Sequence, residues 1–222
     1  MFRMPARARL HRHLTLFRFG VMIVGSGASF IGISCNSTAA NASATCLPSD
    51  VRALVAPTDT LLAYKSADLY GDSTQAVVMV IRHPVSGKSD YDFDNNPCEL
   101  DVLRRENGKL TKADGSAKAV DCTYNDVARD APALSLNDNV TAAPGSIVYV
   151  NQKDKGDNTF YFAWSKEKKA WYLQRATASN PDGNSVTNVS ASYPKNFAWT
   201  TMSSLDPEAI AAVLEERAKA SR

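Results

Sequence analysis

The chain has 222 residues, with 25 Lys and Arg against 23 Asp and Glu, and a net charge of +2 at pH 7. Five arginines precede Asp50, the first acidic residue, and subtracting them from the 25 leaves 20 basic against 23 acidic side chains in the rest of the chain. This slightly acidic remainder provides no basic patch, which excludes a nucleic-acid-binding protein that works through surplus positive charge.

The N-terminal segment has the pattern of an export signal. Its arginine-rich head is followed by an apolar run from Phe19 to Ile33. This run of about 15 residues is shorter than the ~20 that a helix needs to cross a bilayer. A basic head, a short apolar run and then small residues are typical of a secretory signal. The sequence therefore predicts export to a bacterial periplasm.

Processing of this segment has three interpretations. Ala42-Ser43-Ala44 fits a cleavage site of the A-x-A type. Gly32-Ile33-Ser34-Cys35 resembles a bacterial lipobox, in which Cys35 would be acylated and anchor an outer-membrane lipoprotein. The segment could also remain as an uncleaved membrane anchor. In the lipoprotein interpretation, the protein meets the membrane only through its lipid.

The predicted organisation is a leader and tether over residues 1–44 and a single mainly β domain over residues 45–222. The stretch from Asn36 to Thr45 is polar and lacks large apolar residues, as in a disordered tether. A short helix is predicted over Asp50–Val55, capped by Ser49 and ended by Pro57.

Beyond this helix the periodicity is that of strands. Eight strands are predicted: Leu61–Leu69, Gln75–Arg82, Glu99–Arg105, Lys109–Ala113, Ile147–Asn151, Thr159–Ser165, Ala170–Ala178 and Val186–Tyr193. Asn107-Gly108 gives the strongest hairpin signal. A C-terminal helix begins at Asp206, a good N-cap, with Pro207 in the first helical position. The fold class is therefore mainly β (α+β), an antiparallel meander with a short N-terminal helix and a C-terminal helix.

The cysteines agree with export, because oxidising compartments favour disulfides. Cys98 is predicted to pair with Cys122, since both flank a hairpin-like unit. Closing a loop of about 25 residues should stabilise the fold by roughly 3 kcal/mol. Cys46 is then left over, and it is either free or replaces one of the two partners.

Three aspartates at alternate positions, Asp90, Asp92 and Asp94, resemble the first ligands of a calcium loop, with Asp101 at position 12. Asn95 stands where such loops need glycine for the sharp turn, and Asp101 replaces the bidentate glutamate. The same spacing in a strand places three carboxylates on one solvated face. We expect a hydrated strand end held by Cys98, with calcium as the alternative ligand.

The stretch from Ala67 to Ser73, "ADLYGDS", leads into the strand "TQAVVMVI". It resembles the D-x-N-G-D-G turn and buried strand of FG-GAP-like repeats, and also a loose group of exported bacterial proteins. The resemblance spans about Leu61–Ala178. In the repeats the turn often binds calcium, which implies Asp68 and Asp72 as ligands, although Tyr70 stands at a ligand position. The residues themselves predict a Gly-Asp turn before a strand.

Aromatic residues concentrate in the predicted meander. Phe160, Phe162 and Trp164 share one face by period two, which favours core packing. Tyr161 and Tyr172 are then candidates for contacts with a partner protein, because tyrosine offers contact area at low entropic cost. The acidic turn with Asp154 and Asp157 is a second candidate contact, in which electrostatic complementarity would speed encounter.

No catalytic set emerges from the sequence. His83 is the only histidine beyond the leader, and no nucleophile elbow, zinc-protease motif or phosphate loop is present. The predicted function is a non-enzymatic envelope protein without a cofactor that binds a partner protein, for example an immunity protein against a secreted toxin. The alternatives are a calcium- or ligand-binding module and a carboxylate-dependent hydrolase.

Overall fold

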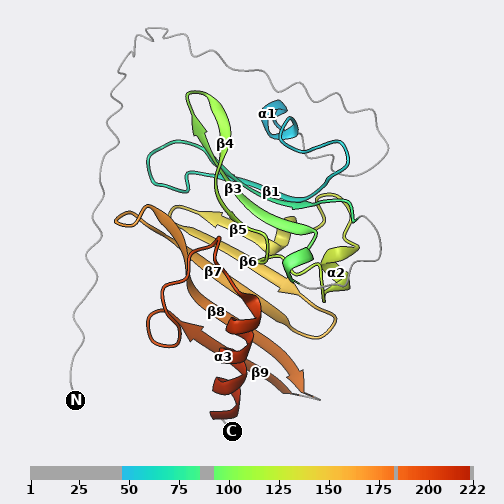
Figure 1. Ribbon diagram of the computed structural model, residues 1–222, viewed down its shortest axis with the longest axis vertical. Helices are drawn as coiled ribbons and strands as arrows, with labels where there is room; N and C mark the ends of the chain where they lie inside the picture. The colour runs from blue at the N-terminus through green and yellow to red at the C-terminus, as the bar shows by residue number, and fades with distance from the viewer. Residues whose placement is uncertain (1–46, 86–92, 183–184, 221–222) are drawn as a thin grey trace, which may run out of the picture. The chain divides into compact units, whose positions relative to one another are not determined.

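The computed structural model describes residues 47–85, 93–182 and 185–220. The chain from residue 47 onward groups into one compact unit. Two antiparallel sheets dominate it, with a short helix near its start and a longer one at its end (Figure 1). The predicted fold class is thus confirmed.

The first sheet contains four strands in sequence order, β1 (Thr60–Ala67), β2 (Ala76–Arg82), β3 (Cys98–Glu106) and β4 (Lys109–Ser116). Apolar residues at every position but the last explain why β2 is buried on both faces. Asn107 and Gly108 both adopt positive φ, so the predicted two-residue hairpin joins β3 to β4. The sheet is consequently a meander.

The second sheet contains five strands, also in sequence order: β5 (Val140–Ala143), β6 (Ser146–Gln152), β7 (Asp157–Ser165), β8 (Ala170–Asp182) and β9 (Ser185–Ser192). Alternation along β6 buries Ile147, Tyr149 and Asn151 and leaves their neighbours half-exposed or exposed. One face of this sheet therefore belongs to the core, as the period of two requires.

The main core lies between the two sheets. Val78 and Leu100 contribute to it from the four-stranded sheet, and Phe162, Trp171 and Leu173 from the five-stranded sheet. A smaller core on the other face of the four-stranded sheet joins Val77, Met79 and Ile81 to Val51 of helix α1 (Ser49–Arg52). The remaining helical segments are α2 (Asp126–Arg129), η1 (Phe93–Asn95) and η2 (Asn137–Asn139).

Helix α3 (Pro207–Ala220) packs against β8 and β9 (Figure 1). Asp206 caps it as predicted, since its Oδ1 accepts hydrogen bonds from the backbone N–H groups of Glu208 and Ala209 at 3.0 and 3.2 Å. Ile210 and Leu214 enter the main core. Within the described residues, no helix is long and apolar enough to span a membrane.

The disulfide predicted between Cys98 and Cys122 is present, with 5.8 Å between the Cα atoms. It joins the start of β3 to the long segment that leads toward the second sheet. Asn96 supports both flanks. Its side-chain amide donates to the carbonyls of Cys98 and Val120 at 2.7 and 2.8 Å, and its oxygen accepts the Cys122 N–H at 3.1 Å.

Three local expectations were wrong. Ser49 is the first residue of the N-terminal helix and not its cap, since Pro48 holds the N-cap position and no side chain caps the helix. This helix ends at Arg52 and not at Val55, and β5 was not anticipated at all. Four residues of modest hydrophobicity, Val140–Ala143, carry little strand signal of their own, and they are held by pairing with Ser146–Tyr149 of β6.

Candidate functional site

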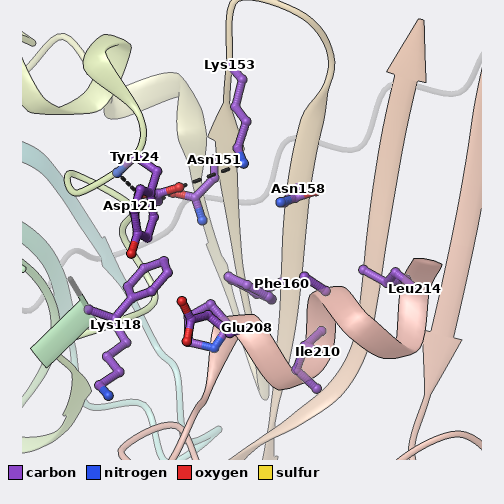
Figure 2. A pocket seen from close by; sticks show the side chains of 13 residues that line it. Lys118, Asp121, Tyr124, Asn151, Lys153, Asn158, Phe160, Glu208, Ile210 and Leu214 are labelled. Atoms are coloured by element: carbon purple, nitrogen blue, oxygen red, sulfur yellow. Dashed lines mark hydrogen bonds and ion pairs between the residues drawn. The ribbon is translucent and has the colours of Figure 1, made fainter. Parts of the chain in front are cut away.

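A cavity of about 300 Å³ opens where α3, the ends of β6 and β7, and the segment after β4 meet (Figure 2). Its apolar wall comes from Phe160 of β7 and from Ile210 and Leu214 of α3, which the helical spacing of four residues places on one face. Lys118, Asp121 and Tyr124 bound it on the side of the disulfide-linked segment. Residues distant in sequence therefore form one amphipathic recess.

The polar side of the cavity is held by Asn151. Its side chain is buried, accepts the Asp121 N–H at 2.8 Å and donates to the carbonyl of Ala119 at 2.7 Å. Asp121 in turn accepts the Tyr124 N–H at 2.8 Å, and Lys153 lies 3.8 Å from its other oxygen. The position of the Asp121 carboxylate is thus fixed by the fold.

Tyr161 and Tyr172 lie on the outer face of the five-stranded sheet, which we define as the face turned away from the main core. Tyr161 is half-buried between the buried Phe160 and Phe162, and the Arg175 guanidinium lies 3.8 Å from its ring centroid. Exposed Gln174 and Arg175 indicate that this face is open to solvent.

Tyr172 belongs to a larger group, the aromatic patch, formed by Tyr172, Tyr193 and Trp199. Residues near Thr200 run antiparallel beside β8, because the Leu173 N–H donates to the Thr200 carbonyl at 2.9 Å. Trp199 consequently stacks on Tyr172, with ring centroids 4.3 Å apart, and meets Tyr193 edge-on at 5.6 Å. Sequence reasoning missed both contacts, because Tyr193 lies in the turn after β9 and Trp199 lies in an irregular segment without periodicity.

The turn between β7 and β8 borders this patch. The Lys168 ammonium lies 3.9 Å from the centroid of the Trp199 ring. Lys166, Lys168 and Lys169 are all exposed, and Glu167 is the only acidic residue among them. We call residues 166–169 the lysine turn. A run of lysines between two strands was visible in the sequence, but its proximity to Trp199 depends on the fold.

The two predicted aspartate contacts lie elsewhere. Asp154 is in the turn between β6 and β7, and Asp157 opens β7, whereas Tyr172 pairs with Ala163 near the other end of that strand. Asp157 accepts a hydrogen bond from the Thr159 hydroxyl at 3.0 Å. The structure therefore does not bring these aspartates together with the tyrosines.

Of the predicted calcium ligands, Asp90 and Asp92 lie outside the described residues. Asp94 forms an ion pair with Lys118 at 2.6 Å, and this hydrogen bond lowers the pKa of Asp94. In the turn between β1 and β2, both Asp68 oxygens accept backbone N–H groups, and Asp72 pairs with Arg104 at 2.8 Å. Within the described part of the chain, no group of three or more His, Cys, Asp or Glu side chains is arranged to hold a metal.

A network of charges crosses the ends of β2, β3 and β4. His83 lies 3.2 Å from both Asp59 and Glu99, and Lys112 lies 2.9 Å from Glu99 and 2.6 Å from Asp101. Burial raises the pKa of Asp101, against the effect of Lys112. Burial would also raise the pKa of Glu99, but Lys112 and His83 outweigh it and the pKa is lowered.

Two carboxyls with pKa values pushed apart are what an acid–base pair needs. However, the recess of about 550 Å³ beside His83 is lined by residues such as Thr60, Arg82 and His83 and includes neither Glu99 nor Asp101. Both carboxylates are occupied by Lys112. The network therefore supports an ion-pair role in the sheet better than the hydrolase alternative.

Replacing Lys112 by methionine is expected to destabilise the protein by about 2 kcal/mol at pH 7, because the Asp101 carboxylate, only 5% exposed, would lose its compensating charge. The loss stays below the range for fully buried pairs since the lysine itself is half-exposed. Urea unfolding measures it, with Lys109→Met on the same strand as the control. The double variant Asp101→Leu/Lys112→Met should recover most of the loss, and failure to do so would count against this role.

His83 should make stability depend on pH. Burial lowers its pKa, but hydrogen bonds to Asp59 and Glu99 outweigh burial, so the pKa in the folded state is raised. The stabilisation is then fully present below the unfolded value of about 6.5 and is lost as pH rises through the folded value. The difference in unfolding free energy between wild type and His83→Asn should be larger at pH 5.5 than at pH 8.5, and below about 1 kcal/mol because the ring is half-exposed. A difference that grows with pH would contradict this.

Searches against protein-family models, curated proteins and solved structures found no match to this chain. The function must therefore be argued from the geometry of its surface.

Proposed function

We propose that the protein is an exported, non-enzymatic binding protein that recognises an acidic surface of a partner protein. The contact is made by the outer face of the five-stranded sheet, through the aromatic patch and the lysine turn. The observation that carries this proposal is the contact between Lys168 and Trp199, because it joins a half-buried aromatic cluster to an exposed basic turn.

Aromatic residues support binding because they bury large areas with few rotatable bonds and are enriched among energetically dominant contacts. Tyr172, Trp199 and Tyr193 contact one another through their rings, so little conformational freedom remains to be lost on association. Arg175 over Tyr161 adds a second aromatic–cation pair on the same face. The patch is consequently organised before a partner arrives.

Charge supports an acidic partner. Lys166, Lys168 and Lys169 are exposed in one turn, and exposed Lys195 follows Tyr193. Positive charges at the edge of a contact speed association with an acidic surface and repel basic ones. These four lysines contrast with the excess of acidic residues in the chain beyond the leader, so the positive charge is confined to this region.

Location supports a partner met outside the cytoplasm. The basic and apolar leader is typical of export, and the Cys98–Cys122 disulfide suits the oxidising periplasm. A toxin delivered to the periplasm is one partner that would fit, with this chain as its immunity protein.

The test compares surface variants in binding to periplasmic extract of the producing cells. Immobilised wild-type protein should retain one dominant partner at low salt and lose it at high salt. The Lys166→Glu/Lys169→Glu variant should bind that partner about tenfold more weakly, since two favourable charges become repulsive.

The matched control is Lys109→Glu/Lys219→Glu, which reverses two exposed lysines on β4 and α3 and leaves the lysine turn intact. It should bind like wild type. An equal loss of affinity in both double variants would show that only net charge matters and would contradict the proposal. Unchanged affinity of the Lys166→Glu/Lys169→Glu variant for the partner would contradict it as well.

A further inference from the structure

The cavity shown in Figure 2 is separate from the outer face and has no role in the proposed function. We propose that it binds a small amphipathic carboxylate, an apolar chain that ends in one carboxyl group. The chain would lie along Phe160, Ile210 and Leu214, and the carboxylate would lie between Lys153 and Asn158.

The size of the cavity sets the class of ligand. About 300 Å³ is at the lower end of small-molecule sites. If each non-hydrogen atom with its hydrogens takes the ~30 Å³ that a water molecule occupies in the liquid, the cavity holds on the order of ten such atoms. This corresponds to a medium-length acyl chain or a substituted aromatic acid.

The apolar wall explains why the ligand needs a hydrophobic part. Phe160, Ile210 and Leu214 are each at most 5% exposed, yet they line open space. Water in contact with such a wall finds few hydrogen-bond partners, so an apolar group that displaces it is favoured.

The polar groups at the mouth explain the carboxylate. The Asn158 side chain is half-buried and makes no hydrogen bond within the described part of the chain. Lys153 is also half-buried, and its ammonium lies 3.8 Å from Asp121, beyond hydrogen-bond distance. Both are donors, and a carboxylate between them would accept from both. Glu208, the other acidic residue at the cavity, is exposed and solvated.

The Asp121 carboxylate does not forbid a second carboxylate at Lys153. Lys112 already binds two carboxylates in this protein, at 2.9 and 2.6 Å. A second recess of about 270 Å³ shares Lys153, Asn158, Ala211 and Leu214 with the first. The proposed carboxylate position therefore lies where the apolar first recess meets a second recess that also contains Asp157 and Glu215, so the apolar chain is expected to occupy the first recess.

The experiment titrates decanoate into ¹⁵N-labelled protein and follows amide chemical shifts, with decanol and butyrate as probes that lack the carboxylate or most of the chain. Saturable changes are expected near residues 118–124, 151–160 and 207–214. Decanol and butyrate should each bind at least tenfold more weakly. Shifts spread over the surface or no saturation for decanoate would overturn the proposal.

Two variants locate the site. Ala211→Trp, which fills the cavity from α3, should abolish decanoate binding, whereas Ala212→Trp on the exposed side of the same helix should not. Lys153→Met should weaken binding about tenfold. Circular dichroism checks that each variant is folded. If Ala211→Trp does not fold, the Lys153→Met variant and the chemical-shift changes of the wild type locate the site. Unchanged affinity of Lys153→Met for decanoate would overturn the proposal.

Discussion

Replacing Gly156 by alanine is expected to lower the free energy of unfolding by about 3 kcal/mol or more. Gly156 has φ of +80° in the turn before β7, a conformation that costs a residue with a side chain roughly 1–2 kcal/mol. A Cβ there would also lie 1.7 Å from the carbonyl oxygen of Ser179, so the backbone of β8 must move. Overpacking of this kind adds about 1–3 kcal/mol.

Gly108 offers a matched control. It has the same φ of +80°, but a Cβ there would meet nothing within 4 Å. Gly108→Ala should therefore show the conformational cost alone, about 1 kcal/mol. Urea unfolding of both variants separates the two causes, and equal losses would mean that β8 does not approach Gly156 this closely.

Removing the disulfide with Cys98→Ala/Cys122→Ala is expected to cost about 3 kcal/mol. The cysteines are 24 positions apart, so the bond restricts a sizeable loop of the unfolded chain. Alanine is the suitable replacement because both positions are 0% exposed and a serine hydroxyl would be buried.

Reduction supplies the independent check for the disulfide. Dithiothreitol should lower the stability of wild type to near that of the double-alanine variant and leave the variant itself unchanged. A variant as stable as oxidised wild type would contradict the assigned contribution, because Asn96 and its hydrogen bonds would then hold the segment alone.

Where local chemistry alone decides the structure, the sequence predicts it well. The apolar run of β2 belongs to a strand buried on both faces, Asn107-Gly108 forms the two-residue hairpin, and Asp206 caps α3. In each case the signal and its cause lie within a few residues. The disulfide could also be predicted, because Cys98 and Cys122 flank a hairpin-like unit.

Features that depend on distant pairing were harder to predict. The division of the meander into two sheets follows from the long segment after β4. Its short helix α2 and the hydrogen bonds from Leu134 and Leu136 to β1 correspond to no periodic pattern in the sequence. β5 exists because β6 offers it a partner. Such elements gain their stability from tertiary contacts and not from propensity.

The candidate sites show the same contrast between features set by local sequence and features set by distant contacts. Alternation along β7 assigned Tyr161 to the face opposite Phe160 and Phe162, and the structure agrees. The contact of Trp199 with Tyr172 joins an irregular segment to strand β8 across 27 positions, and no local sequence pattern predicts it. The cavity beside Phe160 is equally non-local, because α3 supplies one of its walls.

The most direct test of the central claim, that the outer face of the five-stranded sheet binds a partner protein, is site-specific photo-crosslinking in producing cells. A photoreactive phenylalanine analogue replaces Tyr172 in one variant and exposed Thr111 on β4 in another. Position 172 should yield one discrete adduct with an acidic envelope protein, and position 111 should not. Adducts of equal yield at both positions, or an adduct at position 111 alone, would contradict the claim.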